Sequence, residues 1–272
     1  MSITPVQGSG SLAPSSYTQS PSQDLARRVS NVSGGIVSNR NGSLRSPILN
    51  SIRRVTYSNG TVYEGTFLND VPSGSGMFRH PEGHVYIGNC SNGMPSGKGK
   101  LTWLNGNVYE GDWLNGSVTG QGKYISVSGH SYEGSFLDGM KSGKGKLTWP
   151  NGDVYEGDWS NDVRSGKGKL TWLSGNVYEG DWLNGFVTGQ GKYTYANGDV
   201  YEGNFSNGIL SGEGKLTQEN GAIVAEGIFV DNALYTGTLA YFDPPYQCVR
   251  EELWEDGLFV KEISPGVSDD ET

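Results

Sequence analysis

The sequence predicts an all-β protein: an elongated, twisted, antiparallel single-layer sheet of stacked 23-residue β-hairpins, preceded by a disordered N-terminal arm. Glycine accounts for 43 of the 272 residues, more than twice its usual share of about 7%. Each glycine disfavours a helix by roughly 1 kcal/mol relative to alanine. Aromatic residues, which favour strands, are abundant, with 15 Tyr, 7 Trp and 8 Phe. A period of 23 residues arranges both kinds of residue into repeats.

The period is set by a tripeptide, aromatic-Glu-Gly, that returns every 23 residues. It begins at Tyr63, Tyr109, Tyr132, Tyr155, Tyr178 and Tyr201, and the variant Tyr86-Ile87-Gly88 fills the gap. An eighth copy at Ala225 arrives one residue late, and Val249–Gly257 is a decayed ninth copy. We therefore predict a repeat array of about eight hairpins over residues 51–239, followed by a decayed repeat over 240–263 that caps it.

The two flanks of the array differ from it in composition. Residues 1–50 include 12 serines and too few apolar residues to offset the entropy of ordering, so this segment is predicted to be a disordered, basic arm. Within it, Ser30 follows Arg27-Arg28 and is a candidate phosphorylation site, where a phosphate would cancel much of the arm's positive charge. Residues 264–272 form a short acidic tail.

The loop length of each hairpin decides which side chains share a face. In the repeat from Gly97 to Thr119, an Asn-Gly pair separates two strand-like runs, which is a hairpin signal. A two-residue loop would mix Glu110 with Leu101 on one face. A three-residue loop with Gly106 in the left-handed region pairs Leu101 with Tyr109, and it separates apolar from charged positions. The second register is the one we predict.

This register predicts an aromatic core that repeats along the array. Each buried ring contributes roughly 1.5–3 kcal/mol, but a single hairpin is marginally stable, so successive hairpins must stack on one another. The predicted core residues are Tyr63, Tyr86, Tyr109, Tyr132, Tyr155, Tyr178, Tyr201, Phe67, Trp113, Phe136, Trp159, Trp182, Phe205 and Phe229.

The opposite face carries a row of lysines and a row of glutamates. The glutamates are better explained as cross-strand partners of the lysines than as catalytic carboxylates, because equivalent acids recur in six repeats. The lysines are the candidate residues for contact with an anion or a lipid. They are Lys100, Lys123, Lys146, Lys169, Lys192 and Lys215.

The remaining chemistry-bearing residues show no pattern of a reactive site. The histidines His80, His84 and His130 and the cysteines Cys90 and Cys248 lack metal-ligand spacing and form no disulfide framework. We therefore predict no catalytic residue, no metal and no cofactor. No apolar run approaches the roughly 18 residues of a membrane span. The net charge of −9 argues against nucleic acid as a partner.

The repeated string YEGDWxNGxxxGxGK, with an Asn-Gly turn before it, resembles the MORN (membrane occupation and recognition nexus) repeat. The resemblance covers about residues 52–239. This sequence departs from the motif at Ile87 in place of Glu, at Cys90 in place of an aromatic residue, and at Ser126 and Gln218 in the Trp103 position. The late eighth copy is a further departure. These changes are expected to weaken single repeats and leave the architecture intact.

The resemblance implies a non-catalytic scaffold that contacts a protein partner or associates with itself. One alternative is a phospholipid-contact module that uses the lysine row on phosphoinositides. Another is a targeting module acting in trans for an enzyme such as a SET-type methyltransferase or a phosphatidylinositol phosphate kinase. The expected location is cytoplasmic, peripheral at a membrane or the cytoskeleton.

Overall fold

The computed structural model describes residues 52–243 and 247–263, which contain strands and turns and no helix. The predicted arm with Ser30 and the predicted acidic tail lie outside the described residues. The described residues fall into two compact units. We call residues 52–150 and 159–162 the N-terminal unit, and residues 151–158 with the described part of 163–263 the C-terminal unit.

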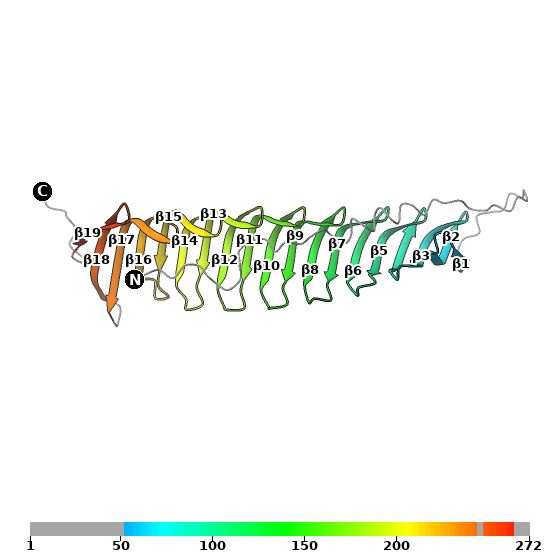
Figure 1. Ribbon diagram of the computed structural model, residues 1–272, viewed down its shortest axis with the longest axis horizontal. Helices are drawn as coiled ribbons and strands as arrows, with labels where there is room; N and C mark the ends of the chain where they lie inside the picture. Colours follow the sequence, from blue (N-terminus) through cyan, green and yellow to red (C-terminus); the bar gives the residue numbers. More distant parts are fainter. Residues whose placement is uncertain (1–51, 244–246, 264–272) are drawn as a thin grey trace, which may run out of the picture. The chain divides into compact units, whose positions relative to one another are not determined.

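Each unit is a series of antiparallel strands in sequence order (Figure 1). The N-terminal unit contains β1 (Ile52–Thr56), β2 (Val62–Leu68), β3 (Val71–Arg79), β4 (Val85–Ser91), β5 (Met94–Thr102), β6 (Val108–Leu114), β7 (Ser117–Ile125), β8 (Ser131–Leu137) and β9 (Met140–Thr148). The residues of β10 (Val154–Ser160) are divided between the units. The C-terminal unit contains β11 (Val163–Thr171), β12 (Val177–Leu183), β13 (Phe186–Thr194), β14 (Val200–Ser206), β15 (Ile209–Thr217), β16 (Ile223–Val230), β17 (Ala233–Asp243), β18 (Gln247–Glu255) and β19 (Leu258–Ile263). The predicted hairpin sheet is confirmed in each unit.

The predicted hairpin register is also confirmed. Leu101 lies opposite Tyr109 and Lys100 lies opposite Glu110. The backbone N–H of Trp103 donates to the carbonyl of Asn107 at 2.9 Å, which closes the loop. Gly106 has a φ of +86°, a conformation that a residue with a Cβ rarely adopts.

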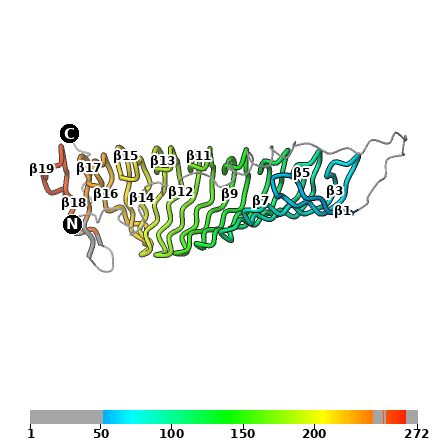
Figure 2. The backbone as a smooth tube through the Cα atoms, turned by 45° about the vertical axis from the view of Figure 1, so that its right-hand side comes forward, coloured from blue at the N-terminus to red at the C-terminus, as the bar shows by residue number. Residues whose placement is uncertain are grey.

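A second, tighter turn joins each hairpin to the next, so that the hairpins follow one another side by side (Figure 2). Between β6 and β7, Asn115 and Gly116 have φ values of +48° and +83°. Two consecutive positive φ angles are typical of a type I′ turn, which matches the twist of the flanking strands. The second Asn-Gly pair of the repeat, Asn115-Gly116, therefore closes this tighter turn.

A β-bulge bends each repeat at its glycine pair, and this feature was not predicted. Gly111 lies opposite Gly122, whereas Asp112 lies opposite Thr119, so two residues of β7 are left over at this point. A Cβ built on Gly122 would lie 2.4 Å from the Tyr109 hydroxyl. Only glycine therefore leaves room for the tyrosine ring, which explains why glycine recurs beside every repeat tyrosine.

The aromatic residues predicted as the core are all buried, none of them more than 8% exposed. In the N-terminal unit, neighbouring rings alternate edge to face from Tyr86 to Trp159, with centroids 5.0 to 5.4 Å apart. The C-terminal unit repeats the arrangement from Tyr155 to Phe229 at 5.1 to 5.5 Å. Each edge-to-face contact adds about 0.5–1.5 kcal/mol beyond burial, so the ring rows hold successive hairpins together.

Two departures from the motif are absorbed locally. Cys90 takes the place of a ring, and its Sγ lies 3.2 Å from the Tyr63 hydroxyl. The late eighth copy is accommodated by a bulge, because Leu216 lies opposite Ala225 while Thr217 lies opposite Ile223. Val224 is thus the additional residue, and the pairing of β15 with β16 continues on both sides of it.

Candidate functional site

The exposed face of the repeats carries the predicted lysine and glutamate rows as neighbouring, oppositely charged side chains. Lys100 lies 3.6 Å from Glu110, and the equivalent ion pairs are Lys123–Glu133 at 3.4 Å, Lys192–Glu202 at 2.9 Å and Lys215–Glu226 at 3.9 Å. These side chains are 41 to 69% exposed. Exposed pairs of this kind contribute only about 0–1 kcal/mol each. The row therefore presents alternating charge and no concentrated positive field.

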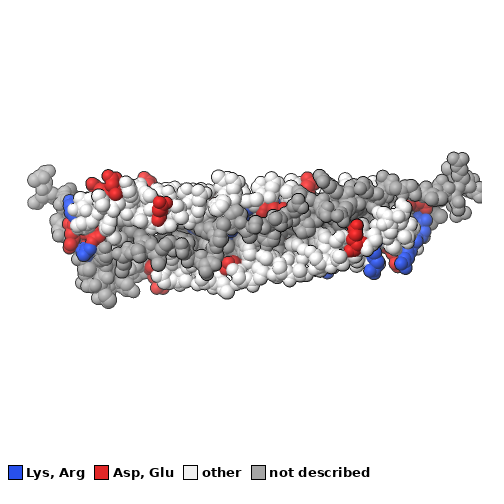
Figure 3. All heavy atoms as spheres, in the orientation of Figure 1, with Lys and Arg blue, Asp and Glu red and all other residues white. Residues whose placement is uncertain are grey.

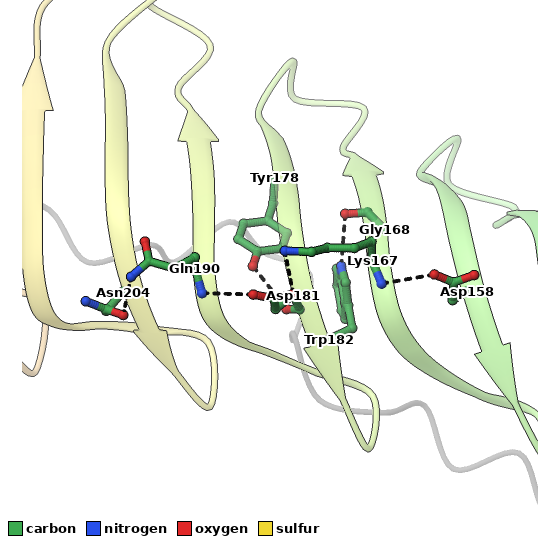
Figure 4. A network of polar contacts seen from close by, with 8 residues as sticks. All are labelled: Asp158, Lys167, Gly168, Tyr178, Asp181, Trp182, Gln190 and Asn204. Carbon is green, nitrogen blue, oxygen red and sulfur yellow. Dashed lines mark hydrogen bonds and ion pairs between the residues drawn. The ribbon is translucent and has the colours of Figure 1, made fainter.

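A second polar row, next to the glycine bend, holds the bulge in place. Asp181 accepts a hydrogen bond from the backbone N–H of Gln190 at 3.1 Å and forms an ion pair with Lys167 at 2.7 Å (Figure 4). Asp158 accepts the backbone N–H of Lys167 in the same way at 3.1 Å. These carboxylates satisfy N–H groups that the bulge removes from the strand ladder.

Asp112 is the equivalent residue in the N-terminal unit. Its carboxylate lies 2.7 Å from the Lys98 ammonium and accepts the backbone N–H of Gln121 at 2.9 Å. The hydrogen bond from Lys98, followed by that from Gln121, lowers the pKa of Asp112 below its ordinary value. Both contacts favour the ionised form of the Asp112 carboxylate.

The exposed face of the N-terminal unit is hollowed by a shallow depression of about 680 Å³. Its charged lining residues are Lys98, Lys100, Lys123, Glu110 and Glu133, and glycine backbone lies between them. Because the lining contains both positive and negative side chains, the depression suits a polypeptide that carries both charges better than it suits a polyanion.

The loops of the hairpins carry exposed apolar side chains at one position of the repeat. Leu104 and Val127 in the N-terminal unit and Leu173 in the C-terminal unit are 71%, 68% and 75% exposed. The backbone N–H of Leu104 donates to His84 Nδ1 at 3.1 Å, and that of Val127 donates to Asn107 Oδ1 at 3.1 Å. The same bond joins Leu173 to Asp153 at 2.9 Å. The loop that carries each apolar side chain is thus hydrogen-bonded to the loop of the preceding repeat. We call Leu104, Val127 and Leu173 the loop-edge row.

Comparison with protein families identifies the repeat. The family profile described as MORN repeat matches seven consecutive segments that together span residues 63–223, more than half of the chain. The chain belongs to the MORN-repeat family. A search of curated proteins gave no match.

The solved structures that are similar to this chain include two domains. The TCP domain of SAS-4 (dCPAP) from Drosophila melanogaster, solved with a proline-rich motif of Ana2, is 16% identical, with 70% of this chain and 95% of that chain covered and a TM-score of 0.38. The G-box domain of the microcephaly protein CPAP is 14% identical, with coverages of 64% and 96% and a TM-score of 0.25. At these scores neither likeness bears on function.

Two MORN repeats of this chain place a cation, buried in Arg164 and half-buried in Lys141, at a position where other repeats have Val118 or Val187. Arg164 is 8% exposed, its guanidinium lies 4.3 Å from the Trp182 ring centroid, and it donates to the carbonyl of Gly185 at 2.8 Å. Burial lowers the pKa of Arg164 to about 10. This buried arginine was not predicted from the sequence. The signal for it was a basic residue at a repeat position where other repeats have valine.

Lys141 holds the same place in the MORN repeat of the N-terminal unit. Its ammonium lies 5.0 Å from the Trp159 ring centroid and 3.5 Å from an Asp162 carboxylate oxygen. Burial lowers the pKa of Lys141, while Asp162 opposes that shift. Both cations lie over rings of the core, which assigns them to packing rather than to a ligand.

The histidines and cysteines of the MORN array form no metal site. Within residues 52–243 and 247–263, no group of three or more His, Cys, Asp or Glu side chains could hold a metal ion. His84 accepts a loop N–H, and His80 Nδ1 lies 3.3 Å from the Thr61 hydroxyl. In the described part of the chain, no helix is long and apolar enough to span a membrane.

Proposed function

We propose that the chain is a non-catalytic scaffold that binds another protein through its loop edge. The observation that supports this function is the loop-edge row, three apolar side chains that are each more than two-thirds exposed. Leu104 and Val127 lie in the loops of successive repeats of the N-terminal unit, and Leu173 holds the same position in the C-terminal unit. Exposed apolar side chains at such recurring positions mark sites of association. Because each of the three occupies the same position of a repeat, modest contacts add up along the array.

The charge pattern supports a protein in preference to an anionic membrane. Lys100, Lys123, Lys192 and Lys215 each lie within 4 Å of a glutamate. A basic surface that attracts anionic lipid requires several lysines with no acidic neighbours. Figure 3 shows one face, on which the described atoms away from the ends are mostly uncharged. The alternative of a targeting module for an enzyme in another chain rests on the sequence resemblance alone.

Site-specific photo-crosslinking in the native cell tests the proposal. A photoreactive residue at position 104, 127 or 173 of the full chain is expected to form a covalent adduct with the same protein. The matched control positions are 114, 137 and 183, where leucines of similar exposure (57%, 55% and 59%) lie at the tight-turn ends of their strands. Adducts that are absent at the loop edge, or equally strong at the control positions, would overturn the proposal.

Vesicle flotation tests the lipid alternative directly. The full chain is mixed with phosphoinositide vesicles at physiological salt, and we expect no recovery with the vesicles. If the chain is recovered with the vesicles, and this recovery is lost when the six lysines of the row are replaced by Glu, the partner is a lipid and not a protein.

A further inference from the structure

The Lys–Glu row is interrupted at its C-terminal end. In a regular repeat each glutamate has a lysine on both sides: Glu202 lies opposite Lys192 in β13 and opposite Lys215 in β15. Glu226 on β16 has Lys215 on one side, but the residue opposite it on β17 is Thr238. The shorter threonine therefore occupies the position where the repeat places a lysine.

The next strand, β18, places a second carboxylate on this face, while its arginine, Arg250, forms an ion pair with Glu252. Glu251 on β18 lies opposite Ala240 on β17 and opposite Ile263 on β19. Its carboxylate oxygen Oε1 lies 3.6 Å from the Cys248 thiol. Glu226 and Glu251 thus flank β17 from both sides, on the face that carries Thr238 and Ala240.

A cavity of about 300 Å³ lies over this interruption. Its walls are the apolar side chains of Ile223, Val224 and Ala240 together with Thr238, Glu226 and Glu251. Lysine and arginine side chains place an apolar stem against apolar surface and a charged head beside polar groups. Carboxylates are the strongest hydrogen-bond acceptors for such a head. Three apolar residues next to two carboxylates therefore suit the apolar stem and the charged head of a basic side chain.

We propose that this cavity binds the lysine or arginine side chain of a polypeptide, which supplies the cation that Thr238 does not. The inference rests on the proposed protein-binding role, but it uses the exposed face of the C-terminal unit and none of the loop-edge row. The two carboxylates of the lining assign the occupant, by charge complementarity, to a basic side chain of the partner protein. The chain's own residues 1–51, which include Arg27, Arg28, Arg40 and Arg45, are the competing outcome of the test.

Methyl NMR of the full chain tests the inference, because Ile223, Val224 and Ala240 bring methyl groups to the cavity walls. The probes are N-acetyl-lysine methylamide, N-acetyl-arginine methylamide and, as the uncharged control, N-acetyl-norleucine methylamide. We expect the first two to shift these methyl signals and the third to leave them in place. Equal shifts with norleucine would overturn the proposal, since they would show that the cavity binds an apolar side chain whether or not it carries a charge.

Three variants locate the interaction. Glu226→Gln with Glu251→Gln is expected to weaken probe binding by about tenfold, the loss of one charge-assisted contact. Thr238→Lys completes the row within the chain and is expected to abolish binding. Glu179→Gln, in a regular part of the row, is the matched control and is expected to bind as the unchanged chain does. Probe binding that survives Thr238→Lys at full strength would refute the assignment.

A fourth variant identifies the source of the basic side chain. In the full chain, Arg27, Arg28, Arg40 and Arg45 are replaced together by Gln. Unchanged probe binding is expected and supports a partner protein as the source. Tighter probe binding would overturn that assignment and give the cavity to the chain's own segment. Failure of the NMR test would leave the loop-edge crosslinks unaffected, so the two proposals are tested separately.

Discussion

Replacing Tyr178 by alanine removes one ring from the aromatic row of the C-terminal unit. The side chain is 1% exposed, and its ring centroid lies 5.5 Å from that of Trp182 and 5.1 Å from that of Phe205. Its hydroxyl donates to the carbonyl of Asp181 at 3.0 Å. Truncation of a buried aromatic side chain costs about 3–5 kcal/mol. We expect a loss of that size in the free energy of unfolding.

The hydroxyl contribution is separated by Tyr178→Phe, which keeps the ring. This change removes one hydrogen bond and is expected to cost about 1 kcal/mol. The control is Glu179→Ala, because Glu179 is the next residue and is exposed on the other face. Loss of that exposed charge is expected to cost less than about 1 kcal/mol.

Guanidinium denaturation followed by tryptophan fluorescence measures these differences. Since repeat arrays are held together mainly by neighbour contacts, amide hydrogen exchange in β12 and β13 is measured alongside to detect local opening. We expect Tyr178→Ala to accelerate exchange in these strands and Glu179→Ala to leave it unchanged. Equal losses for the two variants would refute the assignment of the faces and, with it, the ring row as the source of stability.

Three further predictions concern the bend and the turns. Gly122→Ala would place a Cβ 2.4 Å from the Tyr109 hydroxyl, so we expect a loss of about 1–3 kcal/mol from overpacking, measured by thermal unfolding; an unchanged melting temperature would contradict it. The lowered pKa of Asp112 means that its stabilisation is present above the unfolded-state pKa and is lost as the pH falls through the folded-state pKa. The stability difference between the unchanged chain and Asp112→Asn should therefore shrink in acid denaturation as the pH falls below the ordinary pKa of an aspartate, and a difference that stays constant through the acid range would disprove this linkage. At Asn115, with a φ of +48°, substitution by alanine should cost about 1 kcal/mol and substitution by glycine should be nearly neutral. Equal melting temperatures for those two variants would show that the turn is not under this constraint.

The fold and its faces were predictable because they depend on local patterns. The 23-residue period, the three-residue loop with Gly106 and the pairing of Leu101 with Tyr109 all follow from turn chemistry and from the side-chain alternation of strands. The lysine and glutamate rows follow from the same register. The loop-edge row was not predicted, because exposed apolar residues in loops are common and only the structure shows which of them are held in place.

The sequence by itself determined the repeat, the hairpin register and the two faces, since each of these is set by residues that are neighbours along the chain or directly across a hairpin. The tertiary structure alone decided how the repeat bends, which carbonyl each tyrosine hydroxyl reaches, and where Arg164 is buried. These features arise when a bulge at a glycine pair brings a ring of one hairpin against its neighbour. A period in the sequence records that such contacts recur, whereas their geometry depends on the summed packing of several strands.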